Sequence, residues 1–188
     1  DIVSGDFYWF AEIEDKNQLI VAVADCTGHG VPGAFMTIMG NNFLNQIVKE
    51  NKITSPGKIL EALDKKVLGA LGGKSSKPSK KKRKIQDGMD IALVLIDFEE
   101  EKVTFSGAKR PLYYFKNHTM EIIKGSKYPI GSTQYVEKAF DEKVISIKKG
   151  DAIYMFSDGY PDQFGGGDNT KGWKINYFPK FENWHTLF

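Results

Sequence analysis

An apolar segment that ends on a single carboxylate constrains the fold of this chain more than any other feature. Residues 19–40 read LIVAVADCTGHGVPGAFMTIMG, and the apolar run at their start predicts a buried strand. The run stops at Asp25, and a loop with three glycines follows before apolar residues return at helical spacing. Because glycines keep side chains out of the way, this arrangement indicates a rigidly held acid beside backbone that another group can approach closely.

A hairpin is predicted near the start of the chain. Residues 7–13 and 18–24 are both strand-like, and the turn signal EDKN lies between them. In a hairpin centred on that turn, Asp6 lies directly opposite Asp25, with the two Cβ atoms roughly 5 Å apart. Two carboxylates at that distance repel each other unless a proton or a cation lies between them.

The rest of the chain predicts two helices and then a series of strands. Residues 34–49 and 55–71 have helical spacing, and the second helix has Ser55 as a candidate cap and Pro56 in its first turn. Strand patterns separated by hairpin-like breaks occupy 90–98, 102–108, 111–117, 119–125 and two parts of 143–159. A hairpin, two consecutive helices and a strand meander favour the α+β class with antiparallel sheets over alternating βαβ units.

The composition fits one globular domain. The chain has 188 residues and 41% hydrophobic residues, enough to bury a core. One cysteine, Cys26, excludes a disulfide framework and a multi-cysteine zinc site. No apolar run has the length of a membrane span and no signal peptide opens the chain, so we expect a cytoplasmic domain without membrane contact. Because the sequence opens on the strand-like DIVSGDFYW, we expect residues 1–188 to be a single domain truncated at both ends.

The charge is concentrated in one basic segment. Residues 74–84, KSSKPSKKKRK, contain seven of the 26 basic residues and no acid, which leaves 19 basic against 24 acidic residues, a net charge of −5, elsewhere. An acidic body of this kind argues against nucleic acid as a partner. Because Ser, Pro and Gly interrupt the lysines, we expect a flexible basic loop over 72–86.

Acidic residues also stand at the ends of other predicted strands. The apolar strand in DAIYMFSDG ends on Asp158, the DGMD segment places Asp87 and Asp90 where another strand begins, and Asp162 follows in YPDQFGG. Asp and Gly are ordinary turn residues, but strand ends can converge on one edge of a sandwich and concentrate negative charge there. Oxygen ligands suit Mg²⁺ or Mn²⁺, and several carboxylates can hold two such ions roughly 4 Å apart, which activates a water for attack on phosphorus.

Four motifs carry a family resemblance. SGDFYW, ADCTGHGVPGAFM, DGMDIALV and SDGYPDQFGG resemble, in the same order, the motifs of the sporulation-phosphatase (SpoIIE-type) branch of the metal-dependent Ser/Thr protein phosphatases, from residue 1 to about residue 167. The resemblance implies an α/β/β/α sandwich of two mostly antiparallel sheets flanked by helices. It also implies two Mn²⁺ or Mg²⁺ ions that hydrolyse phosphoserine or phosphothreonine without a covalent intermediate.

The resemblance assigns roles to individual residues. Asp25 would bridge the two metals, Asp6 would support one of them directly or through water, and Asp158 would complete the other. The backbone carbonyl of Cys26 would be a further ligand. Supporting positions in the same motifs are Gly5, Gly28, His29, Gly30, Asp87, Asp90 and Asp162.

The resemblance also implies a biological setting. Members of this branch form the output domain of bacterial signalling proteins, so an upstream sensor domain is expected in the full-length chain. The implied substrate is phosphoserine on a small regulator similar to an anti-anti-sigma factor. A homodimer is a further expectation.

Two other functions stay open at this stage. The family adds another acidic strand motif downstream of SDG, and the sequence contains no such strand; GDNT at 167–170 lies too close to Asp158. A catalytically impaired module that binds a phosphoprotein is therefore one alternative. Gly28, Gly30 and Gly33 also spell the dinucleotide-binding pattern G-x-G-x-x-G, but that site needs a parallel βαβ unit, and a second helix follows the first here.

Several other residues are assigned ordinary roles. Arg110 could bind phosphate, but a surface arginine is the default, and the thiol of Cys26 is expected to be packed and unreactive. Thr27 and Ser157 are expected to form hydrogen bonds around the loop, since no Ser–His–Asp arrangement assembles around them. The aromatic residues of the tail, 173–188, are expected to pack on the sheet or to leave an apolar patch.

Overall fold

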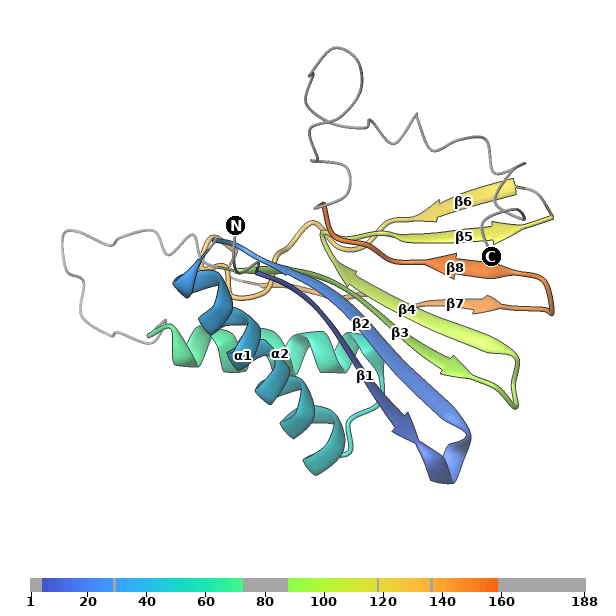
Figure 1. Ribbon diagram of the computed structural model, residues 1–188, viewed down its shortest axis with the longest axis horizontal. Helices are drawn as coiled ribbons and strands as arrows, with labels where there is room; N and C mark the ends of the chain where they lie inside the picture. The colour runs from blue at the N-terminus through green and yellow to red at the C-terminus, as the bar shows by residue number, and fades with distance from the viewer. Residues whose placement is uncertain (1–4, 29, 73–87, 118, 136, 159–188) are drawn as a thin grey trace, which may run out of the picture.

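The fold is a three-layer arrangement of two helices and two antiparallel sheets (Figure 1). It is seen in a computed structural model that describes residues 5–28, 30–72, 88–117, 119–135 and 137–158. The chain runs through β1 (Asp6–Ile13), a 3-10 turn (Glu14–Lys16), β2 (Gln18–Cys26), α1 (Val31–Asn45), a π-helical turn (Gln46–Glu50), α2 (Pro56–Ala70), β3 (Met89–Asp97), β4 (Lys102–Ala108), β5 (Leu112–Lys116), β6 (Thr119–Ile123), β7 (Lys143–Ser146) and β8 (Ala152–Tyr154).

All strand pairs in both sheets are antiparallel. The larger sheet has the order β1-β2-β3-β4-β7, and the smaller one has the order β6-β5-β8. Helices α1 and α2 lie together on one side of the larger sheet, and the smaller sheet lies on its other side (Figure 1). These findings confirm the α+β class and the two antiparallel sheets expected from the sequence.

The predicted hairpin has the predicted register. Ile13 pairs with Gln18 at the turn, and Asp6 pairs with Asp25 at the open end. The turn itself is a short 3-10 segment that closes with Asn17 in the left-handed conformation, at φ 47°. Since Asn tolerates that conformation better than most residues, the turn type is encoded locally.

Two separate apolar cores determine which way the side chains of β2 point. Ile20, Ala22 and Ala24 face a core that they share with α1 and α2, and none of the three is more than 1% exposed. Val21 faces the second core, between the two sheets, which includes Phe105 of β4 and Leu112 of β5. Successive side chains of a strand point to opposite faces, so Asp25 lies on the same side as Val21, toward the smaller sheet.

Both helices differ in detail from the predicted ones. The first begins at Val31 rather than residue 34, because Pro32 takes a position in its first turn that needs no backbone donor. The second begins at Pro56 as expected, with Ser55 in the capping position. The Ser55 hydroxyl, however, donates to Glu142 Oε1 at 2.6 Å, and that same oxygen accepts from the backbone N–H of Gly57 at 2.9 Å. The carboxylate that caps α2 therefore comes from a distant part of the chain.

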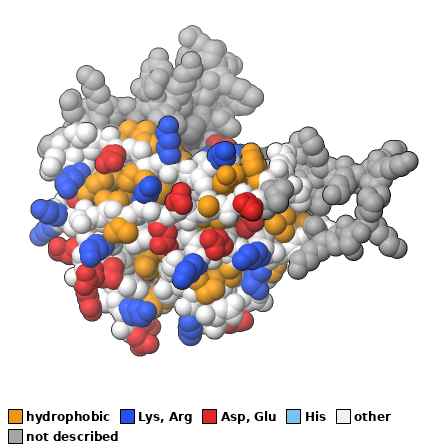
Figure 2. All heavy atoms as spheres, turned by 180° about the vertical axis from the view of Figure 1, so that it is seen from behind, with side chains coloured by type: hydrophobic (Ala, Val, Ile, Leu, Met, Phe, Trp, Pro, Cys, Tyr) orange, Lys and Arg blue, Asp and Glu red, His pale blue; other side chains and the backbone are white. Residues whose placement is uncertain are grey.

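The surface shown in Figure 2 carries both signs of charge. Lysine and arginine side chains alternate with aspartate and glutamate side chains over this face, without a continuous basic area. Within the described residues, no helix is long and apolar enough to cross a membrane. Almost all of the predicted basic loop (72–86) and the whole aromatic tail (173–188) lie outside the described residues.

Candidate functional site

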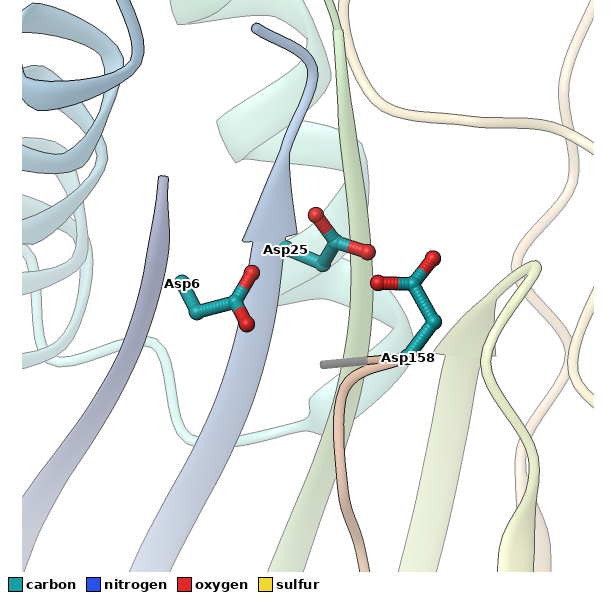
Figure 3. Close-up of side chains that lie close together, drawn as sticks. All are labelled: Asp6, Asp25 and Asp158. Atoms are coloured by element: carbon teal, nitrogen blue, oxygen red, sulfur yellow. The ribbon is translucent and has the colours of Figure 1, made fainter. Parts of the chain in front are cut away.

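Three carboxylates from both sheets meet at one end of the sandwich. Asp6, Asp25 and Asp158 each place a carboxylate oxygen within 4.8 Å of the others (Figure 3). Asp25 lies between the other two, and the carboxylates of Asp6 and Asp158 approach it from either side. The three acids singled out as catalytic and metal-binding residues from the sequence are thus brought together by the fold.

The strand register aligns two of these acids with a fourth. Asp6 on β1, Asp25 on β2 and Asp90 on β3 occupy paired positions across three neighbouring strands. Paired side chains of antiparallel strands lie on the same face, so the three acids form a row. Asp90, at the far end of the row, is paired with Lys109 at 3.1 Å, and only Asp6 and Asp25 join Asp158 in the cluster.

Asp158 reaches the cluster from the smaller sheet. It follows β8, and its neighbour Ser157 donates a hydrogen bond to Asp6 Oδ2 at 2.7 Å. The hydroxyl thereby links the end of β8 to the start of β1. The expectation that Ser157 serves as a hydrogen-bonding residue is confirmed, and Thr27 acts similarly, since its hydroxyl donates to the carbonyl of Gly88 at 2.9 Å.

The glycines of the first two motifs allow close backbone contacts beside the acids. A Cβ on Gly5 would lie 2.5 Å from the carbonyl oxygen of Cys26, and a Cβ on Gly33 would lie 2.6 Å from the carbonyl oxygen of Gly28. Gly28 and Gly30 both have positive φ, 103° and 67°, which a side chain would make costly. These positions therefore require glycine to hold the loop between β2 and α1 against the start of β1.

Arg110 is the site residue that sequence reasoning missed. It was expected at the surface, but its side chain is 17% exposed, and one terminal nitrogen, Nη2, donates to Asp25 Oδ2 and to Asp158 Oδ2, the latter at 2.8 Å. The expectation was wrong because the loop between β4 and β5 folds over the ends of β2 and β3. One signal was available: only two of the 26 basic residues are arginines, and Arg110 is the one outside the basic segment.

The electrostatics of the cluster shift the pKa values of two of its acids in opposite directions. Burial and, to a smaller extent, the negative charges of Asp158 and Asp6 together raise the pKa of Asp25 to about 7, although the positive charge of Arg110 opposes them. Partial burial works against ionisation of Asp158 too, but the hydrogen bond and the charge of Arg110 outweigh it and lower the pKa of that carboxyl. An added cation would favour the ionised form of Asp25 and so lower its pKa.

The remaining predicted positions differ in what the structure shows. The thiol of Cys26 is buried, and burial raises its pKa to about 12, which confirms a packed, unreactive thiol. His29, Asp87 and Asp162 lie outside the described residues. The dinucleotide alternative is not supported, because β3, the strand that follows the two helices, is antiparallel to β2 and forms no βαβ unit with it.

The donor set fits a hard divalent cation. The three carboxylates supply only oxygen ligands. The carbonyl of Cys26 lies at the same strand end, and residue 5 does not crowd it because glycine has no Cβ. Mg²⁺ and Mn²⁺ prefer such oxygen ligands over thiolate or imidazole. The pKa of Asp25 stays raised despite the charge of Arg110, because burial disfavours the ionised carboxylate and the two neighbouring acids add to this effect.

Comparison with known proteins assigns the family. The model of the Stage II sporulation protein E (SpoIIE) family matches residues 15–176, so the chain belongs to the SpoIIE family. The fold agrees: the SiaA-PP2C domain of Pseudomonas aeruginosa superposes with a TM-score of 0.75 and 28% sequence identity, covering 91% of this chain and 62% of that one.

Two further relatives come from Bacillus subtilis. Phosphoserine phosphatase RsbU of strain 168 is 26% identical over 163 residues, which make up 84% of this chain and 42% of RsbU. The PP2C phosphatase domain of SpoIIE, solved with a fragment of its regulatory domain, has a TM-score of 0.64 and 23% identity, covering 88% of this chain and 44% of that one. The chain therefore spans less than half the length of either relative.

Proposed function

We propose that this chain is a phosphatase domain that hydrolyses phosphoserine or phosphothreonine on a regulatory protein, with Mn²⁺ or Mg²⁺ as cofactor. The observation that carries the proposal is the convergence of Asp6, Asp25 and Asp158 from the two sheets. Membership of the SpoIIE family and the likeness to RsbU, a phosphoserine phosphatase, support it.

The residues of the cluster have distinct parts in this proposal. Two ions would be held by Asp6, Asp25, Asp158 and the carbonyl of Cys26, with Asp25 shared between them because it is the central acid (Figure 3). When bound, such ions supply a water activated for attack on phosphorus and neutralise charge on the phosphoryl oxygens. The strand pairing holds Asp6 and Asp25 in place, and the Ser157 hydroxyl orients the carboxylate of Asp6.

The setting of the domain is part of the proposal. RsbU is more than twice as long as the matched region, which supports an upstream sensor domain in the complete protein. We propose a small phosphoserine regulator, similar to an anti-anti-sigma factor, as substrate, a cytoplasmic location, and a homodimer formed by the complete protein. We also propose supporting roles for Gly5, Gly28, Gly30 and Asp90; the tight contact of Gly5 with the carbonyl of Cys26 and the pairing of Asp90 with Asp25 favour such roles.

Phosphate release by the purified chain tests the proposal. With Mn²⁺ present, the chain should release phosphate from an aryl phosphate and from a phosphoserine peptide, and a chelator should abolish the release. Asp25→Ala should reduce turnover by at least about a hundredfold, as expected for loss of a group that holds the activating ion. Asp97→Ala is the matched control, because Asp97 pairs with Gln18 at the opposite end of the same strands.

The outcomes separate the two functions considered above. Turnover that is independent of metal, or equal in Asp25→Ala and Asp97→Ala, contradicts the proposed mechanism. Calorimetry with Mn²⁺ distinguishes the impaired module: two tight sites support the enzyme, whereas one weak site or none supports a module that binds without turnover.

A further inference from the structure

Arg110 holds the position in which a cation would contact both Asp25 and Asp158. Its Nη2 atom donates to one oxygen of each carboxylate; Asp25 lies on β2 of the larger sheet, and Asp158 lies in the segment that follows β8 of the smaller sheet. A single nitrogen thus bridges the two acids that the proposed function assigns to the metal ions. The side chains of Arg110 and Asp25 are 17% and 18% exposed, so their ion pair is largely enclosed, whereas the Asp158 side chain is 50% exposed.

The backbone around Arg110 is built to hold it there. The preceding residue, Lys109, has φ 61°, and its N–H donates to the carbonyl of Ser126 at 2.7 Å. A Cβ on Gly107 or Gly125 would lie only 2.3 or 2.6 Å from the carbonyl oxygen of Arg110. Two glycines and a left-handed residue therefore fix the start of the arginine side chain beside the cluster.

The hydrogen bonds of the guanidinium are incomplete. Its Nε atom is buried and has no acceptor in the described part of the chain, although a buried guanidinium normally uses its donors. The ion pair therefore gives both acids a hydrogen-bond donor but leaves one donor of the arginine without an acceptor. Because the hydrogen bonds of the guanidinium are already incomplete, moving it away from the two acids does not break a complete set of hydrogen bonds.

A divalent ion cannot share this position with the guanidinium. The oxygens that accept from Nη2 are Asp25 Oδ2 and Asp158 Oδ2, and a metal bound between them would need the same oxygens and the same space. Like charges in contact would also repel each other strongly.

We propose that Arg110 is the built-in counter-cation of the cluster when metal is absent, and that a divalent ion entering between Asp25 and Asp158 must displace it. This inference rests on the proposed metal site. Its consequence is that Arg110 sets the metal concentration at which the site loads: the side chain keeps the ion-free acids together and lowers their affinity for metal.

Calorimetry of Mn²⁺ binding to the chelator-treated chain tests the exchange. Arg110→Met should tighten Mn²⁺ binding by at least about tenfold, because a positive charge in contact with two ligands is removed. It should also lower the melting temperature in chelator and enlarge the rise that Mn²⁺ produces. Lys109→Met is the matched control: it removes the neighbouring cation, which is paired with Asp90 instead, and should change the dissociation constant by less than about threefold.

Nuclear magnetic resonance of the wild-type chain gives a test that does not depend on a variant at position 110. The chain has two arginines, so its spectrum has two Nε–H signals, and Arg83→Lys identifies the one from Arg110. Addition of Mg²⁺ should shift or broaden the Arg110 signal and leave the Arg83 signal unchanged.

Each outcome supports or overturns the inference. Unchanged or weaker Mn²⁺ binding by Arg110→Met, an equal effect of Lys109→Met, or an Arg110 signal that ignores bound Mg²⁺ refutes the exchange while leaving the metal site intact. Absence of any Mn²⁺ or Mg²⁺ binding by the wild-type chain refutes both the exchange and the proposed function.

Discussion

The burial of Asp25 beside two other carboxylates gives a quantitative prediction about the metal-free protein. The pKa of Asp25 rises from 3.8 to about 7 on folding, so the ionised carboxylate is destabilised in the folded state. A shift of about three units corresponds to roughly 4 kcal/mol at full value. Burial is the largest cause of this shift, and the repulsion from the other carboxylates adds to it. Because the Asp158 side chain is 50% exposed, solvent screens part of that repulsion, and we expect Asp25→Asn to stabilise the metal-free protein by about 1–2 kcal/mol at pH 8.

The pH dependence has a definite sign. A carboxyl whose pKa is higher in the folded than in the unfolded state binds more protons when folded, so the free energy of unfolding of the wild type falls as pH rises from about 4 to about 7. The advantage of Asp25→Asn should therefore be absent near pH 4, grow up to pH 7 and stay constant above it. Urea unfolding in chelator, followed by circular dichroism at several pH values, measures this.

Asp97→Asn is the control of opposite sign. Asp97 accepts from the backbone N–H of Glu100 and from the side chain of Gln18, and these hydrogen bonds lower its pKa. Its substitution should therefore destabilise the protein at pH 8. The reasoning is refuted if Asp25→Asn is no more stable than the wild type in chelator at pH 8, or if its advantage does not change with pH.

Further predictions concern the packing around the site and the coupling of metal to protons. Lys138→Met should lower the free energy of unfolding, measured with urea, by about 3–5 kcal/mol, because it leaves the carboxylate of Asp64, 2.6 Å from the lysine, buried without its cation. Adding Asp64→Asn should recover much of the loss, and additive effects of the two substitutions would contradict this reasoning. Gly33→Ala should cost about 1–3 kcal/mol through its clash with a backbone carbonyl, whereas Gly69→Ala, with nothing within 4 Å, should gain about 0.5–1 kcal/mol; equal effects would disprove the clash. Mn²⁺ binding at pH 6 should release about one proton, mainly from Asp25, and a smaller number of protons at pH 8.5. Calorimetry in buffers of different ionisation enthalpy measures this proton release. A release that does not change with pH would exclude Asp25 as its source.

The hairpin shows what local sequence can predict. The two strand-like segments and the short turn between them were enough to place Asp6 opposite Asp25, and the structure has that register. The length of the turn fixes the register of a hairpin, because a turn of another length would pair Asp25 with a different residue. The acids at the open end of the hairpin follow from this register without further information.

The capping of α2 shows where local sequence stops being sufficient. Ser55 is predicted as the cap and occupies the capping position. The acceptor for the backbone N–H of Gly57, however, is the carboxylate of Glu142, which lies 85 residues further along the chain. Helix-capping propensities describe residues that are close in sequence. Glu142 comes close to the start of α2 only in the folded structure, in which β7, the strand that follows it, pairs within the larger sheet.

By itself, the sequence determined the strands, the two consecutive helices, the family motifs and the pairing of Asp6 with Asp25 in the first hairpin, because each depends on residues that are close along the chain. Only the tertiary structure decided that Asp158 reaches Asp25 from the second sheet and that Arg110, 85 residues from Asp25 and 48 from Asp158, lies between them. Those contacts follow from how the two sheets pack through their shared apolar core, and nothing in the local pattern around residue 110 specifies that packing.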